Sequence, residues 1–425
     1  MVTSKQIPEN ICCSTLPSGI RVVSEFVETV ESVSIGLWIG TGSCDESTDE
    51  AGITHFIEHM LFKGTATRTA RKIADDIESG GGQLNAYTSK DVTCYETRVL
   101  ASETETAIDV LCDMLCNSSF DDEEINREIQ VVLEEIKMIE DTPEEAVLDL
   151  YDSNAFGSNP LAPPVLGTAA TVSSITREKI LQTMRLRYCP NRIVVAAAGN
   201  VHHDRLVQLV TRYLGHMEGK SDARPYIALQ TSPGQTRVTR RDAEQVHFVL
   251  GGPGVSRHDP GRYALSILSN CLGGNMSSRL FQEIREKRGL AYNIGTYSRV
   301  FDTGGSLCAF GGTSNENFDL VVDLTIAEFE RVRQDGLEKD ELHKAVRQMS
   351  GVIPLSLEGM AARMARLGDT MMFYNRVIPL TEVLEAYQAV DHNSVLEAAR
   401  ASLDPASIAL AAIGPFKKTG RRKAT

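Results

Sequence analysis

The feature that most constrains the fold of this chain is an internal repeat of about half its length. Residues 190–199 have the sequence PNRIVVAAAG and residues 405–414 have the sequence PASIALAAIG, an offset of 405 − 190 = 215. Earlier in each half, residues 33–37 (VSIGL) and 246–250 (VHFVL) are offset by 246 − 33 = 213. Two matches in the same order at nearly one offset indicate two copies of one unit. The alternative is a chance likeness, because strands draw on few residue types.

The repeat divides the chain of 425 residues into two domains of similar structure. A single hydrophobic core rarely serves so long a chain. Between the two copies, the sequence is rich in glycine, serine and proline, which is typical of a linker. We therefore expect an N-terminal domain at residues 1–216, a linker at 217–235 and a C-terminal domain at 236–425.

Hydrophobic periodicity predicts short strands that alternate with long amphipathic helices. The expected strands are residues 20–26, 33–39, 93–100, 193–198, 238–241, 246–250, 292–300, 306–311 and 408–413. The expected helices include residues 53–62, 70–79, 103–116, 122–140 and 177–188. Short connections between several strand pairs favour antiparallel pairing. The expected fold class is α+β, with each domain a mostly antiparallel sheet flanked by helices.

The formal net charge is -14, which favours cationic partners such as basic peptides and disfavours nucleic acid or an anionic membrane surface. Solubility alone also explains such a charge. The basic run at residues 417–423 is expected to be a frayed tail rather than a binding site.

The composition predicts a soluble protein with reduced thiols. The 9 cysteines are scattered without paired metal spacing. The N-terminus has neither the apolar core of a secretory signal nor the arginine-rich character of a transit peptide, and no apolar stretch reaches the length of a membrane span. We expect a soluble intracellular protein.

The segment His55-Phe-Ile-Glu58-His59 has two histidines at helical spacing. Residues i and i+4 of a helix lie on one face, so His55 and His59 can bind one zinc ion. Glu58 lies on the same face, where a carboxylate can take a proton from zinc-bound water. The alternative is a chance motif with satisfied core histidines, which should arise in on the order of one chain in a hundred.

A catalytic zinc site usually has a third protein ligand. In the acidic helix expected at residues 122–140, Glu128 and Glu135 lie two turns apart on one edge of the apolar stripe, whereas Glu134 points away from the core. We predict Glu135 as the third ligand and Glu128 as a supporting residue that hydrogen-bonds a ligand. For both residues the alternative is a solvated carboxylate.

Several motifs together resemble the pitrilysin-type (M16) zinc metallopeptidases, and among them the half-length subunits related to mitochondrial processing peptidase and its bacterial homologues. The resemblance covers nearly the whole chain. The motifs are residues 55–65 (HFIEHMLFKGT), 81–88 (GGQLNAYT), 131–136 (VVLEEI), 277–281 (SSRLF) and 285–292 (REKRGLAY). The spacing from His59 to Glu135, 135 − 59 = 76 residues, is similar to that of the third ligand in the family.

The resemblance implies a clamshell of two similar α+β halves around a closed chamber, with one zinc ion per chain in the first half. The duplication agrees with a single site. Adding 213 to the numbers of the motif residues leads to Leu268, Cys271 and Leu272, which cannot form a second zinc site.

The resemblance also assigns roles outside the zinc motif. Tyr292 would donate a hydrogen bond to the developing oxyanion, and Arg285 would steady carbonyl or carboxylate groups of the substrate. The structural alternatives are a helix cap for Arg285 and an ordinary strand position for Tyr292. Asn85 and Ala86 resemble the edge strand on which an extended peptide pairs through its backbone. A hairpin turn at residues 80–82 is the structural alternative there.

The predicted function is that of a zinc-dependent metalloendopeptidase of the inverted-motif class, which cleaves extended peptides or unfolded segments in the chamber. The zinc motif and the Arg285 and Tyr292 pair occur in one chain, which resembles a self-sufficient bacterial-type enzyme and favours a homodimer. The resemblance implies a cytoplasmic location, and a mitochondrial matrix location is less favoured. A glycine-rich loop like that of the non-catalytic mitochondrial subunit is absent from the sequence. The alternatives are a non-catalytic structural core subunit of the same fold and a peptide-binding chamber with an incidental metal.

Overall fold

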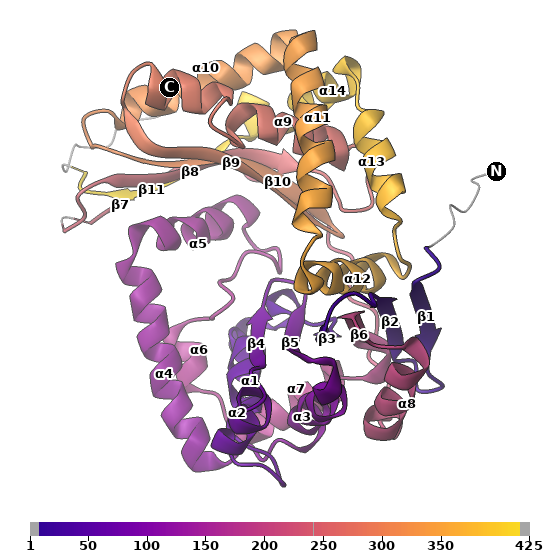
Figure 1. The fold of residues 1–425 in the computed structure, drawn as a ribbon. Coiled ribbons are helices and arrows are strands. Elements are labelled where there is room, and N and C mark those ends of the chain that lie inside the picture. Colours follow the sequence, from indigo (N-terminus) through magenta and orange to yellow (C-terminus); the bar gives the residue numbers. More distant parts are fainter. Residues whose placement is uncertain (1–7, 241, 417–425) are drawn as a thin grey trace. The chain divides into compact units, whose positions relative to one another are not determined.

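The computed structural model describes residues 8–240 and 242–416, which form two compact units (Figure 1). Unit 1 comprises the described residues of Met1–Ile136, Pro164–Arg224 and Ile353–Val383. Unit 2 comprises those of Lys137–Pro163, Pro225–Val352 and Leu384–Thr425. The basic run at residues 417–423, Arg241 and residues 1–7 lie outside the described residues.

Unit 1 is built on a six-stranded sheet, sheet 1, with the order β1-β2-β6-β3-β5-β4. Only the pair of β2 and β6 is parallel. The strands are β1 (Ile11–Thr15), β2 (Arg21–Phe26), β3 (Ser32–Ile39), β4 (Gln83–Thr88), β5 (Thr93–Leu100) and β6 (Ile193–Gly199). The helices are α1 (Ile53–Leu61), α2 (Ala70–Glu78), α3 (Thr104–Asn117), α4 (Asp122–Asp141, assigned to this unit as far as Ile136), α6 (Ala169–Ser173), α7 (Arg177–Arg187), α8 (His203–Leu214) and α12 (Met360–Tyr374).

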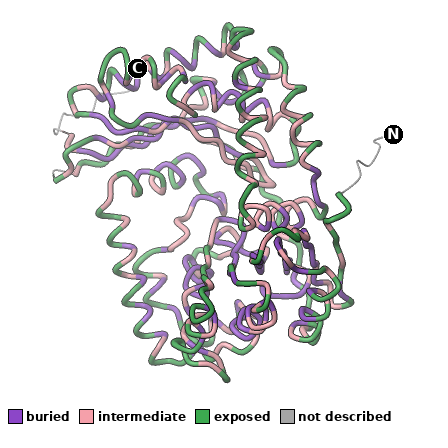
Figure 2. The backbone as a smooth tube through the Cα atoms, viewed as in Figure 1, coloured by how far each residue is buried: buried purple, intermediate pink, exposed green. Residues whose placement is uncertain are grey.

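The central strands β3 and β6 of sheet 1 are buried on both faces, which explains why they are almost continuously apolar. Along β3, Val33, Ile35, Leu37 and Ile39 belong to a large core with α1, α3 and α8, whereas Trp38 belongs to a second core with α12. Successive side chains of a strand point to opposite faces, so the two cores lie on the two sides of the sheet. Figure 2 shows the central strands as buried backbone between helices whose outer faces are exposed.

The chain's single tryptophan, Trp38, lies at the contact between sheet 1 and α12 and is fully buried. A Cβ atom on Gly36 would lie 2.2 Å from its indole ring, and one on Gly368 of α12 would lie 2.5 Å from it. The indole nitrogen donates a hydrogen bond to Asp369 at 3.2 Å. Because glycine has no side chain, Gly36 and Gly368 make room for the indole ring between the strand and the helix.

Unit 2 is built on a five-stranded sheet, sheet 2, with the order β7-β11-β8-β10-β9. Its strands are β7 (Gly234–Thr239), β8 (Val246–Gly254), β9 (Ala291–Phe301), β10 (Gly304–Thr313) and β11 (Ala409–Gly414). The helices are α5 (Pro143–Phe156), α9 (Arg262–Gly273), α10 (Phe318–Asp335), α11 (Lys339–Ser356), α13 (Leu380–Gln388) and α14 (His392–Ser402). Three of the five boundaries between the units fall inside α4, α11 and α13, and the other two lie between residues 163 and 164 and between residues 224 and 225.

Sheet 2 is also covered on both faces. Phe248 and Leu250 of β8 belong to a core with α9, α10 and α14. Helix α5 packs against β8 and β11, and its buried Asp152 forms an ion pair with Arg299 of β9. A buried carboxylate needs such a partner, so this pair supports the contact of α5 with the sheet.

The two sheets share one topology. The order β2-β6-β3-β5-β4 of sheet 1 corresponds to β7-β11-β8-β10-β9 of sheet 2, and in both sheets the first pair is parallel and the others are antiparallel. The strands with matching sequences, β6 with β11 and β3 with β8, occupy equivalent positions. The topology thus agrees with the duplication inferred from the sequence, and the expected α+β class is confirmed.

Each unit contains a helix from the other half of the chain. Helix α5 precedes the expected linker but packs in unit 2, and α12 follows the linker but packs on sheet 1 in unit 1. The expected domains, 1–216 and 236–425 with a linker at 217–235, remain a prediction about the duplicated units. The contacts in space show in addition that the two halves exchange a helix, so no single boundary in the sequence separates the two compact units.

The expected elements correspond to observed ones with small shifts at their ends. The strand expected at residues 238–241 is an exception, because β7 begins at Gly234 and ends at Thr239. Strand β1 was not expected, and residues 80–82 connect α2 to β4, so they do not form the turn of a hairpin.

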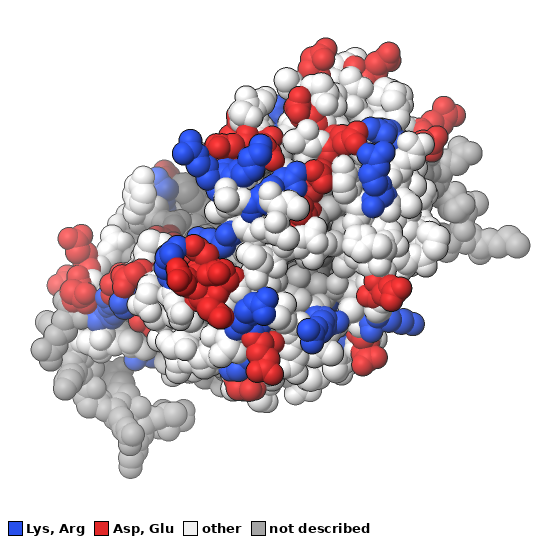
Figure 3. All heavy atoms as spheres, turned by 90° about the horizontal axis from the view of Figure 1, so that it is seen from below, with Lys and Arg blue, Asp and Glu red and all other residues white. Residues whose placement is uncertain are grey.

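None of the helices in the described part of the chain is long and apolar enough to span a membrane. On the face shown in Figure 3, acidic and basic side chains are interspersed. The net negative charge is therefore not gathered into one patch on that face.

We predict that Gly368→Ala lowers the free energy of unfolding by about 1–3 kcal/mol, because the new methyl group overpacks the site against Trp38. Urea unfolding, followed by tryptophan fluorescence and circular dichroism, measures the change. Gly351 of α11 is the matched control, since a Cβ atom there meets nothing within 4 Å. Gly351→Ala should be neutral or stabilising, and a Gly368→Ala protein as stable as the parent would contradict the packing.

Candidate metal centre

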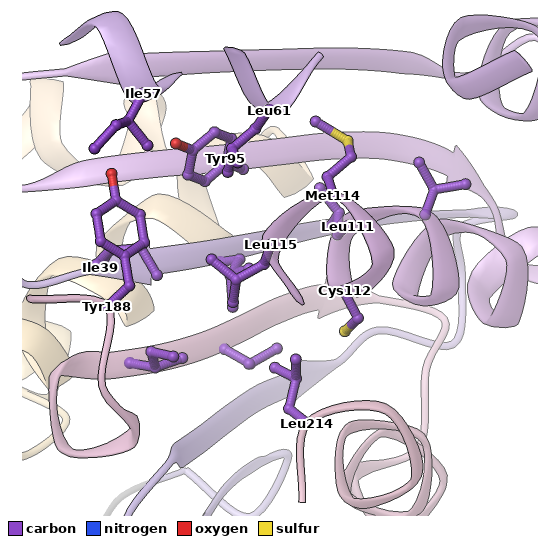
Figure 4. Close-up of a cluster of buried hydrophobic side chains, with 14 of the residues drawn as sticks. Ile39, Ile57, Leu61, Tyr95, Leu111, Cys112, Met114, Leu115, Tyr188 and Leu214 are labelled. Atoms are coloured by element: carbon purple, nitrogen blue, oxygen red, sulfur yellow. The ribbon is translucent and has the colours of Figure 1, made fainter. Parts of the chain in front are cut away.

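Helix α1 carries the His-x-x-Glu-His motif and is buried along nearly its whole length. Ile57 and Leu61 lie in the core of unit 1 near Tyr95 of β5 and Tyr188 (Figure 4). These apolar contacts fix the rotation of the helix about its axis. The motif's histidines and Glu58 consequently occupy the other face of α1.

The N-terminus of α1 is held by a glycine and a carboxylate. Gly52 has φ 92°, and a Cβ atom there would lie 2.4 Å from the carbonyl oxygen of Leu166, so the position requires glycine. Glu46 accepts hydrogen bonds from the backbone N–H of Gly52 at 2.8 Å and of Thr54 at 2.7 Å. Burial raises the pKa of Glu46 to about 7, although both backbone hydrogen bonds oppose the shift.

Three side chains from two helices converge beside α1. The rings of His55 and His59 lie one turn apart, with centroids separated by 4.6 Å. Glu135 of α4 places its Oε2 atom 3.9 Å from His55 Nε2 and 3.8 Å from His59 Nε2. Among the residues that the structure describes, these three form the one group found whose donor atoms could hold a metal ion.

The three residues fit a zinc ion. Zinc, with bonds of about 2.0–2.2 Å to nitrogen and oxygen, holds tetrahedral ligand atoms roughly 3.3–3.6 Å apart. The observed separations therefore need only small side-chain movements. Glu135 Oε2 is buried and has no hydrogen-bond partner within the described residues. Such an oxygen is costly unless a cation lies beside it.

Glu128, which is not part of the donor group, supports His59. Its Oε1 atom lies 2.8 Å from His59 Nδ1, and its Oε2 atom lies 2.5 Å from the ammonium nitrogen of Lys63. A hydrogen bond at Nδ1 fixes the ring so that Nε2 faces Glu135. The pKa of Glu128 is lowered because the hydrogen bonds from His59 and Lys63 outweigh the effect of burial. Glu128 is therefore a charged partner of the ring.

The pKa values of the two imidazoles are shifted in opposite directions. Burial and the neighbouring charge of His59 lower the pKa of His55 to about 3, so this ring is neutral at physiological pH. Burial also disfavours the charged form of His59, but the hydrogen bond to Glu128 and the nearby carboxylates raise its pKa above the ordinary value. An imidazole must be neutral to bind a metal ion, so metal binding would release a proton from any protonated His59.

Glu58 lies beside the donor group. It is only 8% exposed, and its Oε2 atom accepts a hydrogen bond from the hydroxyl group of Thr88 at 2.5 Å. Burial raises the pKa of Glu58, and the hydrogen bond from Thr88 opposes this shift. The carboxylate is thus held near the histidines by a contact from a different segment of the chain.

Asn85 and Ala86 lie on β4, an edge strand of sheet 1. They pair with Glu96 and Tyr95 of β5. Within the described residues, no strand pairs with the other edge of β4. That edge can accept an extended peptide through backbone hydrogen bonds.

Arg285 and Tyr292 lie together in unit 2. Arg285 is part of a π-helical turn, Phe281–Glu286, and its guanidinium group lies 4.6 Å from the ring centroid of Phe281 and 4.8 Å from that of Tyr292. Tyr292 is 79% exposed near the start of the edge strand β9. The two aromatic rings hold the guanidinium group through cation–π contacts. The side chain of Tyr292 is therefore accessible to solvent.

In the second copy of the repeat, no corresponding donor group is found among the residues that the structure describes. Leu268, Cys271 and Leu272, the residues equivalent to the motif, lie on α9 and are buried in the core of unit 2. Helix α9 thus serves packing where α1 presents polar side chains.

The structure brings together five of the predicted site residues in unit 1 and two others in unit 2. Sequence reasoning missed Thr88, Lys63, Glu46 and Phe281. Thr88 ends the motif at residues 81–88, and Lys63 follows His59 by four residues, so both positions carried a signal. Two imidazoles and a carboxylate beside a further buried carboxylate form a set typical of metal-dependent hydrolases.

Comparisons with known proteins agree with this class. Residues 21–169 match the family described as Insulinase (Peptidase family M16), and residues 174–349 match the one described as Peptidase M16 inactive domain. An uncharacterized zinc protease of Streptomyces coelicolor is 39% identical over 95% of this chain and 89% of its own length. One of Bacillus subtilis is 39% identical over 94% of this chain and 97% of its own length. The chain therefore belongs to peptidase family M16.

Solved structures show the same fold. The peptidase M16 inactive domain from Pseudomonas fluorescens has a TM-score of 0.90 at 19% identity and covers 96% of this chain and 98% of its own. A protease from Helicobacter pylori has a TM-score of 0.88 at 19% identity and covers 95% of this chain and 99% of its own. The half of this chain without the donor group includes most of the match to the domain described as inactive.

We predict that Glu46 makes the metal-free protein less stable as the pH rises. The pKa of Glu46 is about 7 in the folded protein and about 4.5 when unfolded, so the folded state holds this proton more tightly. The free energy of unfolding should therefore fall between about pH 4.5 and 7. Glu46→Gln should reduce this slope in urea unfolding with a chelator present, whereas the exposed control Glu78→Gln should keep it. Equal slopes for Glu46→Gln and the parent would refute the assignment.

Proposed function

We propose that this chain is a metalloendopeptidase that holds one zinc ion through His55, His59 and Glu135. The observation that carries the proposal is the buried Glu135 Oε2 atom, which lies 3.8 Å and 3.9 Å from the two imidazole nitrogens and has no hydrogen-bond partner within the described residues. Membership of family M16 and the names of the relatives as zinc proteases support it.

In this proposal Glu58 is the proton carrier. When bound, zinc would polarise the substrate carbonyl and lower the pKa of the attacking water. Glu58 takes a proton from that water while the oxygen adds to the carbonyl carbon. The carboxylic acid then gives the proton to the departing amide nitrogen as the C–N bond breaks. The raised pKa of Glu58, caused by burial, suits both steps.

Substrate recognition would rest on the backbone of the edge strand β4. Asn85 and Ala86 are proposed to pair with an extended peptide through backbone hydrogen bonds. Such pairing depends on the shape of the peptide more than on its sequence, so it favours unfolded segments. Tyr292 is proposed to donate a hydrogen bond to the developing oxyanion, and Arg285 to bind carbonyl or carboxylate groups. Basic peptides suit the acidic charge of the chain.

The enclosed chamber, the homodimer and the cytoplasmic location remain predictions from the sequence and the family resemblance. A non-catalytic core subunit would not require an intact Glu58 beside the donor group. A peptide-binding chamber with an incidental metal would keep its biological activity without Glu58. The next experiment separates both alternatives from a peptidase.

We predict that Glu58→Gln keeps stoichiometric zinc but loses peptidase activity by about 100-fold or more, because the proton acceptor is removed and the ligands are not. Zinc content by elemental analysis and turnover of a quenched peptide library measure the two effects. The library products, mapped by mass spectrometry with and without a chelator, define the cleavage sites. Full turnover by the variant would end the proposed role of Glu58.

We predict that His59→Ala and Glu135→Gln lose zinc, because each removes one of three ligands. Dialysis against buffered zinc followed by elemental analysis measures the loss. Glu134→Gln is the matched control, since its side chain is not part of the donor group. Retained stoichiometric zinc in either ligand variant would reassign the site.

A further inference from the structure

We infer that Thr88 is a positioning residue for Glu58, an inference that rests on the proposed function. The Thr88 hydroxyl group donates to Glu58 Oε2 at 2.5 Å, and the carboxylate that accepts this hydrogen bond is nearly buried. A hydrogen bond to a charged acceptor is stronger than one between neutral groups. The contact therefore selects one orientation of the carboxylate, in which Oε1 is left to exchange the proton.

The burial pattern of β4 agrees with a hydrogen-bonding role for residue 88. Leu84, Ala86 and Thr88 alternate with more exposed residues, so they share the face of the strand that packs toward α1. The first two are apolar. A valine at residue 88 would have nearly the same shape as threonine and would continue that apolar face. The hydroxyl group thus serves hydrogen bonding rather than packing.

The end of β4 that carries Thr88 is fixed by a tight turn. Thr88 pairs with Thr93 of β5, and the intervening turn is closed by a hydrogen bond from the Ser89 backbone N–H to the Val92 carbonyl oxygen at 2.8 Å. The Ser89 side chain makes a second hydrogen bond to that oxygen at 3.0 Å. The donor for Glu58 therefore has little freedom to move.

Thr88 also links the proton carrier to the strand proposed to hold the substrate. It follows Ala86 by two residues and lies on the same face of β4. Glu58 lies on α1, so the hydrogen bond joins two separate segments. A shift of about 1 Å between reacting groups can lower a rate by about 100-fold. The hydroxyl group of Thr88 thus fixes the position of the Glu58 carboxylate relative to the backbone of a substrate peptide bound along β4.

The test compares Thr88→Val, which keeps the shape, with Thr88→Ser, which keeps the hydroxyl group. Thr88→Val should lower kcat by about 10- to 100-fold with little change in KM, and Thr88→Ser should restore most of kcat. Zinc content should equal that of the parent in both variants. Unchanged kcat in Thr88→Val would overturn the inference, as would equal losses in Thr88→Val and Thr88→Ser.

Thr97→Val is the matched control for lost stability. Thr97 is a buried residue of β5 whose hydroxyl group donates to the backbone carbonyl oxygen of Gln83 in β4 at 2.7 Å. This variant removes a hydroxyl hydrogen bond within the same sheet without touching Glu58. It should lower the melting temperature about as much as Thr88→Val does but leave kcat unchanged. A similar loss of kcat in Thr97→Val would show that the sheet, and not the hydroxyl group of Thr88, sets the rate.

Two further measurements separate this inference from the proposed function. In the Glu58→Gln background, Thr88→Val should cause no additional loss of residual activity, because Thr88 acts through Glu58. In crystals of the metal-free protein, the Glu58 carboxylate should leave its position near residue 88 in Thr88→Val and keep it in Thr88→Ser. An unmoved carboxylate in Thr88→Val would overturn the inference. A parent protein without chelator-sensitive peptidase activity would instead refute the proposed function.

If Thr88→Val fails to fold or to bind zinc, Thr88→Cys replaces it. A thiol is a much weaker donor than a hydroxyl group and is of similar size. Thr88→Ser should then retain a higher kcat than Thr88→Cys. Equal kcat values for these two folded variants would overturn the inference.

Discussion

The site depends on the burial of α1 on the side opposite its polar residues. Ile57 and Leu61 lie in the core beside aromatic side chains, so the helix cannot turn about its axis without exposing them. A rotation by one residue, about 100°, would move both imidazoles away from α4. The convergence of the donor atoms is thus a consequence of apolar packing, and Gly52 and Glu46 fix the start of the same helix.

The electrostatics of the site follow from that geometry. Three carboxylates, Glu58, Glu128 and Glu135, lie around two imidazoles, of which His55 is kept neutral by burial. Lys63 balances Glu128 directly. The remaining negative charge suits a divalent cation, which would satisfy Glu135 and leave Glu58 to the Thr88 hydroxyl group. With such a cation bound, each of the three carboxylates would have a distinct partner, although all three belong to two helices.

Much of this arrangement could be predicted from local patterns. Helical spacing placed His55, Glu58 and His59 on one face, and the apolar stripe of α4 distinguished Glu135 and Glu128 from Glu134. The fold class and the family also followed from the sequence. Thr88 could not be assigned to Glu58 in this way, because their contact depends on how β4 lies against α1.

The exchange of helices was also beyond local reasoning. Periodicity describes one element at a time, so it predicts a helix but not the sheet on which the helix packs. Nothing in the sequence around α12 marks it as the cover of Trp38. The glycines at residues 36 and 368 are a signal only when both segments are known to meet.

The exchange has a consequence for how the protein is made. During synthesis all six strands of sheet 1 emerge well before α12, so the face that contains Trp38 has no cover until the chain has been extended past residue 374. Uncovered apolar strands are prone to aggregation and to capture by chaperones. The first half of the chain therefore cannot complete its packing until the second half has been synthesised. A stop codon in the linker would yield a fragment that lacks α12 and leaves the Trp38 face of sheet 1 uncovered.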